Sequence, residues 1–203
     1  MISIKGELAD LIKQRNQRTP EQWKELDNLI WEKFAMERAI LVTDSSQFSL
    51  KTRVRGIIHY LGLILRSHDI IFPIIKKHNG DFLKAEADNV LAVFPTVKDA
   101  LNSAIEMNLK LAEYNEIVPE NEDYNICTGI GWGKVLKYED ELFGNETNIA
   151  YQLGEDIANK DEILLTPAAY EQIKNTKTYN IKFYKNLTFS GFDLKSYQVN
   201  YKV

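Results

Sequence analysis

Cysteine is almost missing from this chain of 203 residues: it has one, Cys127, so an intrachain disulfide cannot form. Cys127 lies in a strand-like run, which indicates a buried free thiol and favours the cytoplasm as compartment. Long hydrophobic runs are missing too, since no continuous apolar segment approaches the roughly 20 residues of a membrane span. The amino terminus carries Lys5 and Glu7 and lacks the apolar core of a signal peptide.

The sequence also has little excess of either charge. It holds 25 Lys and Arg residues against 29 Asp and Glu residues, a formal net charge of −4. This balance gives no general reason to expect a nucleic acid or an acidic membrane as partner. Low-complexity tracts and internal repeats are missing as well. With 44% apolar residues, the composition is that of an ordinary globular protein of one large domain or a domain with an appendage.

What the sequence does contain is an alternation of helical and strand patterns. Residues 1–36 predict two helices, the second starting at Thr19 and Pro20 with Gln22 placed to complete a capping box. We interpret this segment as a helical extension that precedes one domain over residues 37–203. The element order of that domain predicts an α+β fold, in which helices cover one face of a mostly antiparallel sheet.

Within the domain, an apolar run at 39–42 predicts a buried strand, and a helical stripe follows over 50–77. Pro73 should kink this helix or end it near Phe72. A later strand over 124–133 carries three glycines on one face, which indicates that another element packs close to its backbone. They are Gly129, Gly131 and Gly133.

Two aspartates stand where strands end or turn. Asp44 follows the run at 39–42 and precedes small polar residues and a helix, a good place to hold a cation or phosphates. Plain capping of that helix by a serine explains the same residues. Asp88 lies in the turn of a hairpin predicted over 82–94, with Lys84 four residues before it on the same face. The alternative there is a solvated strand edge with a surface ion pair.

Three separated stretches together resemble one family, the class III nucleotidyl cyclases, over residues 38–199. In that family a strand ends in an aspartate, a phosphate-binding turn and Phe-Thr or Phe-Ser, and residues 42–49 are similar. The second motif is reproduced with alanine in place of one glycine, and the third is a glycine-rich strand followed by Gly, three residues and Asn-x-Ala. The residues that carry the last two are Gly80, Lys84, Ala87, Asp88, Ala92, Phe94, Gly129, Ile130, Gly133, Gly144, Asn148 and Ala150.

The resemblance implies an α+β domain with a ferredoxin-like βαββαβ core. It implies that Asp44 and Asp88 hold two Mg²⁺ or Mn²⁺ ions, which activate the ribose 3′-hydroxyl and neutralise the leaving pyrophosphate. Phe48 and Ser49 then bind the substrate, and Asn148 orients its ribose.

Lys84 and Glu141 are the pair that the resemblance assigns to the base, with glutamate in place of the usual aspartate. A lysine with an acid favours adenine, so ATP is the first expectation and a pyrimidine triphosphate the second. In the family the metal aspartates come from one subunit and Lys84, Glu141 and Asn148 from the other. The resemblance therefore implies a head-to-tail homodimer with two shared sites.

Two departures from the family pattern keep a second hypothesis open. Gln152 replaces the transition-state arginine, and Gly191 stands in the region of a phosphate-binding lysine, for which Lys182 or Lys185 could substitute. The first hypothesis is a cyclase that makes a 3′,5′-cyclic nucleotide and pyrophosphate. The alternative is a weak or inactive cyclase-like domain that binds a nucleotide or a partner as a regulatory module. The retained aspartates favour the cyclase, and Gln152 favours the module.

Overall fold

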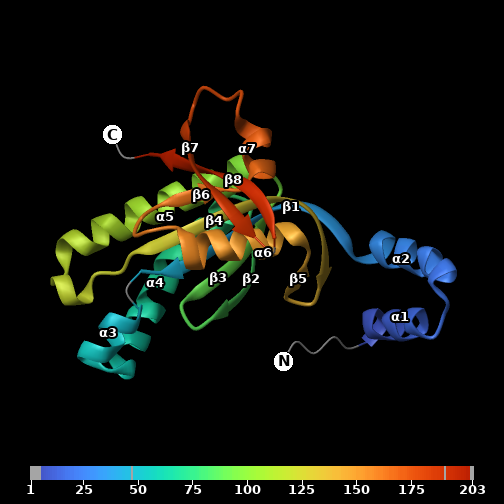
Figure 1. Ribbon diagram of the computed structural model, residues 1–203. Helices are drawn as coiled ribbons and strands as arrows, with labels where there is room; N and C mark the ends of the chain where they lie inside the picture. Colours follow the sequence, from blue (N-terminus) through green and yellow to red (C-terminus); the bar gives the residue numbers. More distant parts are fainter. Residues whose placement is uncertain (1–5, 47, 190, 202–203) are drawn as a thin grey trace.

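A computed structural model of the chain describes residues 6–46, 48–189 and 191–201, apart from the side chains of residues 48–51 and 192. Its strands form one sheet in which every pair is antiparallel except β4 with β6. The predicted α+β fold with a mostly antiparallel sheet is confirmed (Figure 1). In spatial order the strands are β2 (Asp81–Glu86), β3 (Asn89–Phe94), β1 (Ala35–Ser45), β4 (Ile126–Tyr138), β6 (Ile163–Leu165), β8 (Phe192–Asn200) and β7 (Asn180–Phe189), with β5 (Glu141–Phe143) paired to β4.

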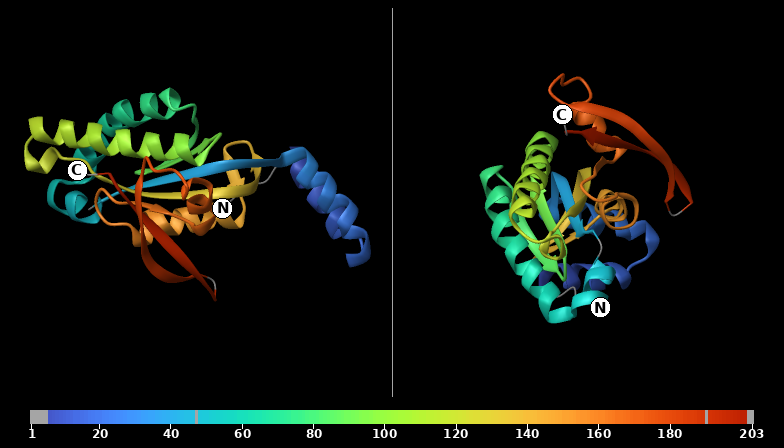
Figure 2. Two further views of the ribbon diagram at one scale, coloured as in Figure 1. Left: turned by 90° about the horizontal axis from the view of Figure 1, so that it is seen from above. Right: turned by 90° about the vertical axis from the view of Figure 1, so that its left-hand side faces the viewer.

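Helices cover both faces of this sheet (Figure 2). Strand β1 shows why, because Ala39 and Leu41 join the core on one side while Ile40 and Val42 pack on the other, near Ala150. The expectation that helices cover a single face is therefore wrong. The first face carries α4 (Ile57–Lys77), α5 (Val97–Ile117) and α7 (Pro167–Ile173), and the second carries α6 (Asn145–Gln152) and the π-helical turn η2 (Leu153–Ile157).

Three glycines of β4 make room for α6 on the second face. A Cβ atom at Gly129 would lie 2.1 Å from the carbonyl oxygen of Ala150, and one at Gly131 would lie 2.9 Å from that of Glu146. At Gly133 the added atom would lie 2.9 Å from the Cγ atom of Glu146. The prediction that another element packs close to this strand is confirmed, and the element is the helix that carries Asn148.

The amino-terminal segment forms two helices that project from the body of the molecule (Figure 1). They are α1 (Gly6–Asn16) and α2 (Pro20–Phe34), as predicted. At the start of α2 the Thr19 amide donates a hydrogen bond to Gln22 Oε1 at 3.3 Å. The helices share a small apolar cluster, which also packs against Leu136 and Tyr138 of β4. Since β1 begins directly after α2, the pair is joined to the sheet without a linker.

The helix predicted over 50–77 is two helices, α3 (Phe48–Arg55) and α4. Further along the chain, a 3-10 turn, η1 (Glu120–Glu122), follows α5. The break falls at Gly56, whose φ of +85° is in the left-handed region that favours glycine. Of the two outcomes expected at Pro73, a kink or an end near Phe72, the end is wrong, because α4 continues through Pro73 to Lys77. Buried Ile71 and Ile74 on either side of the proline anchor the helix in the core, and packing supplies most of a helix's stability.

We expect Gly129→Ala to destabilise the fold by about 3 kcal/mol or more, because the new methyl group collides with the backbone of α6. Urea unfolding measures this difference. The matched control is Gly62→Ala within α4, where an added Cβ meets nothing within 4 Å and the higher helix propensity of alanine should raise stability by up to about 1 kcal/mol. Equal unfolding midpoints for Gly129→Ala and the wild type would contradict this account of the packing.

Candidate active site

Strand pairing brings the two predicted metal aspartates to one place. Because β1 and β3 are antiparallel, the carboxyl end of β1, where Asp44 lies, is beside the turn that joins β2 to β3. Asp88 lies in this turn and is 8% exposed. Its Oδ2 atom accepts hydrogen bonds from the hydroxyl groups of Ser45 and Tyr60, the latter at 3.3 Å. Asp88 is therefore buried among polar donors and held in position by them.

Negative charge accumulates around Asp44. Burial raises the pKa of Asp44, and the nearby carboxylates of Asp88, Glu155 and Asp156 raise it further, to about 7. Burial, followed by Asp156 and Asp88, likewise raises the pKa of Glu155. The neighbouring carboxylates disfavour the ionised forms of Asp44 and Glu155, and the negative charge gathered here attracts a cation.

Sequence reasoning missed Glu155 and Asp156, which lie in η2 directly after α6. Glu155 accepts a hydrogen bond from the side-chain amide of Asn89 at 2.6 Å. This turn reaches β1 because Gly154 allows it: an added Cβ there would lie 3.0 Å from the carbonyl oxygen of Val42. An acidic pair after a helix was visible in the sequence, but its approach to Asp44 depends on this tertiary contact.

The turn of Asp88 also contains Ala87, which stands where the family has glycine. Its φ is +54°, in the left-handed region that glycine adopts without cost. The turn therefore has a glycine-like conformation even though a methyl group makes it less favourable. This local strain lies directly beside Asp88.

The aspartate pair suits a hard divalent cation. Mg²⁺ prefers oxygen ligands and keeps several waters or substrate phosphates, so one or two carboxylates are enough protein ligands. A site of three or more His, Cys, Asp or Glu residues arranged around a metal ion is not found within the described part of the chain. The raised pKa of Asp44 reflects burial and then repulsion by nearby carboxylates, and a bound cation offsets both. The residues fit a metal that shares its coordination with a phosphorylated ligand.

A second group of predicted residues meets in a pocket of about 400 Å³. Lys84 Nζ lies 3.0 Å from both carboxylate oxygens of Glu141 and 3.2 Å from Glu86 Oε1. Burial lowers the pKa of Lys84, but the hydrogen bonds to Glu141 and Glu86 raise it overall. The lining comprises Lys84, Glu86, Leu91, Glu141, Leu142, Thr147, Asn148 and Tyr151.

Glu86 and Tyr151 are pocket residues that sequence reasoning did not single out. Glu86 lies on the same side of β2 as Lys84, two residues on. Tyr151 follows Asn148 on α6, and burial raises the pKa of its phenol to about 12. The pocket thus offers an ammonium group, two carboxylates, an amide and a phenol on a partly apolar floor.

The remaining predicted residues lie at the end of α6, at the start of α3 and on or beside β7. Gln152 is the last residue of α6, one turn after Asn148. Phe48 and Ser49 begin α3, and their side chains lie outside the described residues. Gly191 lies between β7 and β8 with a φ of +84°, and the two candidate substitutes for the missing lysine, Lys182 and Lys185, are on β7 at the edge of the sheet.

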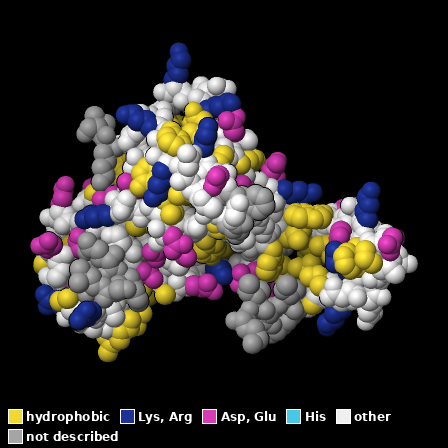
Figure 3. All heavy atoms as spheres, viewed as in Figure 1, with side chains coloured by type: hydrophobic (Ala, Val, Ile, Leu, Met, Phe, Trp, Pro, Cys, Tyr) yellow, Lys and Arg dark blue, Asp and Glu magenta, His cyan; other side chains and the backbone are white. Residues whose placement is uncertain are grey.

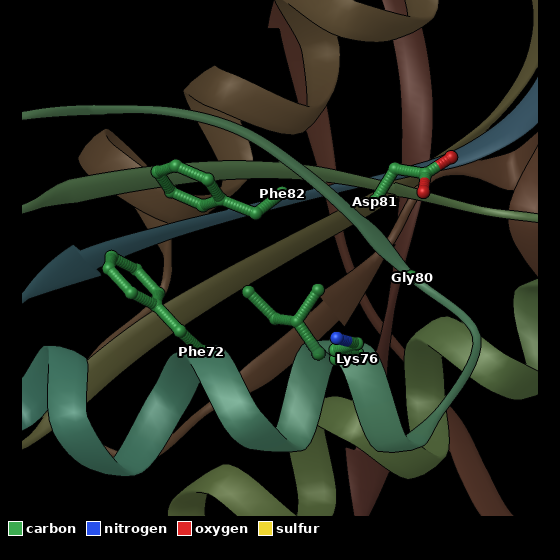
Figure 4. A pocket seen from close by; sticks show the side chains of 6 residues that line it. Phe72, Lys76, Gly80, Asp81 and Phe82 are labelled. Atoms are coloured by element: carbon green, nitrogen blue, oxygen red, sulfur yellow. The ribbon is translucent and has the colours of Figure 1, made fainter.

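A further pocket of about 340 Å³ lies between α4 and β2 (Figure 4). The rings of Phe72 and Phe82 pack against each other on one side of it, with centroids 4.5 Å apart and planes tilted by 45° (Figure 4). Lys76 and Asp81 add one charge of each sign to its rim. Of the predicted site residues whose side chains the structure describes, none lines this pocket.

Comparison with known proteins agrees with the resemblance. No protein-family model matches the sequence. A protein of Rhizobium meliloti (strain 1021) named "Putative adenylate cyclase 3" is 26% identical over 136 residues, which are 66% of this chain and 23% of that protein. The chain thus spans under a quarter of that relative's length.

Solved structures match over most of the chain. An adenylate/guanylate cyclase/hydrolase from Silicibacter pomeroyi matches with a TM-score of 0.73 and 21% identity over 81% of this chain and 96% of that one. The guanylate cyclase domain of RhGC from Catenaria anguillulae in complex with GTP gives a TM-score of 0.67 and 16% identity, over 81% and 96% of the two chains. The chain therefore has the fold of the class III cyclase catalytic domain, and the resemblance seen in the sequence is confirmed at the level of the fold.

We expect Asp44→Asn to stabilise the metal-free protein at pH 8. The pKa of Asp44 is raised in the folded state, so stability is lost as the pH rises from about 4 to about 7 and the unfolded chain ionises first. The amide removes this cost, on the order of 1–3 kcal/mol at pH 8, and has little effect at pH 4. Thermal unfolding in a chelator at both pH values measures the difference. A variant equally stabilised at both pH values, or destabilised at pH 8, would contradict the raised pKa of Asp44.

Proposed function

We propose that this chain, which has the fold of the class III nucleotidyl cyclase catalytic domain, is a nucleotide cyclase. It converts a nucleoside triphosphate into a 3′,5′-cyclic nucleotide and pyrophosphate. The observation that carries the proposal is the meeting of Asp44 and Asp88 in one acidic group at the end of β1.

The unfavourable energy of this acidic group supports a functional role. Asp44 is partly buried beside like charges, and Ala87, next to Asp88, has a left-handed backbone. A neutral side chain at position 44 and a glycine at position 87 would stabilise the fold better, whereas groups that bind ligands commonly lower stability. A structural role for Asp44 as a helix cap gives no reason for the neighbouring acids.

The residues divide the work by their chemistry. Asp44 and Asp88 would hold Mg²⁺ or Mn²⁺, and such ions supply charge to neutralise the triphosphate and acidify the ribose hydroxyl. The Ser45 and Tyr60 hydroxyls fix the Asp88 carboxylate by hydrogen bonds. The Asn148 side chain, which lines the pocket with Lys84, orients the ribose by hydrogen bonding.

The pair of Lys84 and Glu141 supports ATP as the first choice of substrate. An ammonium donor beside a carboxylate acceptor matches a base edge with a ring-nitrogen acceptor and an amino donor, as in adenine. Cytosine carries the same combination on a single ring, which keeps a pyrimidine triphosphate as the second choice. The site of each substrate is shared, with the aspartates from one subunit of a homodimer and Lys84, Glu141 and Asn148 from the other. The buried free thiol of Cys127 fits the reducing cytoplasm that we propose as the compartment.

Gln152 favours a second candidate function, a regulatory module that binds nucleotide without turnover. A glutamine amide donates hydrogen bonds but brings no positive charge to the phosphates. Loss of one preorganised donor typically lowers a rate by about 10²–10³-fold. An assay for the cyclic product distinguishes slow turnover from no turnover.

We expect the purified protein to form a cyclic nucleotide from ATP, or from one other triphosphate, in the presence of Mn²⁺. Asp88→Asn should lower product formation by at least about 10³-fold, since it removes a metal ligand. The matched control is Asp193→Asn on the β7–β8 hairpin, where the carboxylate accepts a hydrogen bond from Thr188. Chromatography of products from all four triphosphates is the readout. Metal-dependent nucleotide binding without product would favour the module, and neither binding nor product would leave a structural dimer.

A mixing experiment tests the shared site. Asp44→Asn and Lys84→Ala should each be inactive alone, yet a mixture should recover roughly a quarter of the wild-type activity, because half of the dimers are mixed and each has one intact site. Lys177→Ala, an exposed lysine outside the pocket, serves as the control in the same mixture. Activity that stays absent on mixing, with dimers confirmed by sedimentation, would place all catalytic groups in one subunit.

A further inference from the structure

A row of large apolar side chains lies exposed along α3 and the first half of α4. On α4 their spacing of three and four residues places them on the side opposite the buried residues Leu63 and Ile74. A helix that is apolar on all sides is normally covered on all sides. The exposed fractions of this row, which we name the α3–α4 stripe, are 67% for Val54, 49% for Ile57, 84% for Ile58, 49% for Leu61 and 65% for Leu65.

The charged residues of the chain segment that carries the stripe are all basic. The segment from residue 45 to residue 68 contains four Lys and Arg residues and neither Asp nor Glu, although the chain as a whole has a net charge of −4. Arg53 and Arg55 are exposed beside Val54, whereas Arg66 pairs with Glu122. Figure 3 shows hydrophobic side chains next to basic ones at the lower left, where α3 and α4 lie. The net charge of the whole chain therefore does not indicate that this surface is basic and apolar.

The stripe continues towards the pocket between α4 and β2. His68 stacks on Phe72 with ring centroids 4.5 Å apart, and Phe72 meets Phe82 at the same separation. Phe82 is 42% exposed. Residues 61, 65, 68 and 72 follow one another at steps of three and four, so they lie on one side of α4. This side is apolar or aromatic over most of its length.

Helix α4 lies along the domain rather than away from it. By length and composition it could cross a membrane, but a third of the residues in its most apolar segment are buried inside the fold. Its inner side packs against α5 and the sheet. A bilayer can therefore contact only the outer side of α4, as it does with a helix that lies in the membrane interface.

We infer that the α3–α4 stripe docks on the surface of an anionic lipid bilayer, with its apolar side chains in the interface and Arg53 and Arg55 at the headgroups. Apolar burial together with basic residues is what binds such helices to anionic membranes. A two-fold contact centred on the stripe fits less well, because it would bring Arg53 and Arg55 of one copy to the same arginines of the other. This inference is independent of the proposed function.

Flotation with vesicles tests the inference on the full-length protein. We expect binding to phosphatidylcholine vesicles that contain phosphatidylserine, and little binding to phosphatidylcholine alone. Ile58→Asp with Leu65→Asp should lower the bound fraction at least about tenfold through lost apolar burial. Arg53→Gln with Arg55→Gln should lower it about tenfold and weaken its dependence on salt. The control is Ile117→Asp, which changes an isoleucine that is 82% exposed on α5.

The outcomes that overturn the inference are distinct. Docking through the stripe is rejected if the protein floats with neither kind of vesicle. It is also rejected if Ile117→Asp lowers the bound fraction as much as the stripe variants do. Self-association that Ile58→Asp abolishes, without vesicle binding, assigns the stripe to a contact between copies. Circular dichroism of each variant verifies folding, and the arginine variant changes two exposed side chains that the core does not need.

Discussion

The proposed site depends on the position of Asp44 beside Asp88. This arrangement is unfavourable for the metal-free fold. Antiparallel pairing of β1 with β3 fixes the two backbones, and the hydroxyl groups of Ser45 and Tyr60 fix the Asp88 side chain. Burial and like charges raise the pKa of Asp44 to about 7. Since the fold keeps charges together that repel, the arrangement is best explained by a ligand that brings positive charge.

The second face of the sheet determines where the residues proposed to bind the nucleotide lie. The glycines of β4 let α6 approach the backbone, and this approach places Asn148 in the pocket with Lys84 and Glu141. The same packing carries η2 towards β1, where Glu155 adds to the acidic group. One feature of β4, the lack of side chains at three positions, thus supports both parts of the proposed site.

Local patterns predicted much of this structure, and contacts between distant segments account for the rest. Periodicity, capping and the glycine face predicted the element order, and the family resemblance implied that Glu141 would be the partner of Lys84, which it contacts in the structure. The break at Gly56 was missed because the apolar stripe runs on through it, and passage of α4 through Pro73 depends on core packing. Glu155, Tyr60 and Tyr151 were missed because their roles arise only when separate elements come together. Net charge likewise gave no sign of the basic, apolar side of α3 and α4.

The central claim is that Asp44 and Asp88 form one site for a divalent cation. Electron paramagnetic resonance of free Mn²⁺, with a non-reacting triphosphate analogue present, counts the ions that the protein binds. The account predicts binding by the wild type that tightens as the pH rises through about 7, and loss of that binding in the doubly substituted protein Asp44→Asn/Asp88→Asn. Equal Mn²⁺ binding by both proteins would contradict it.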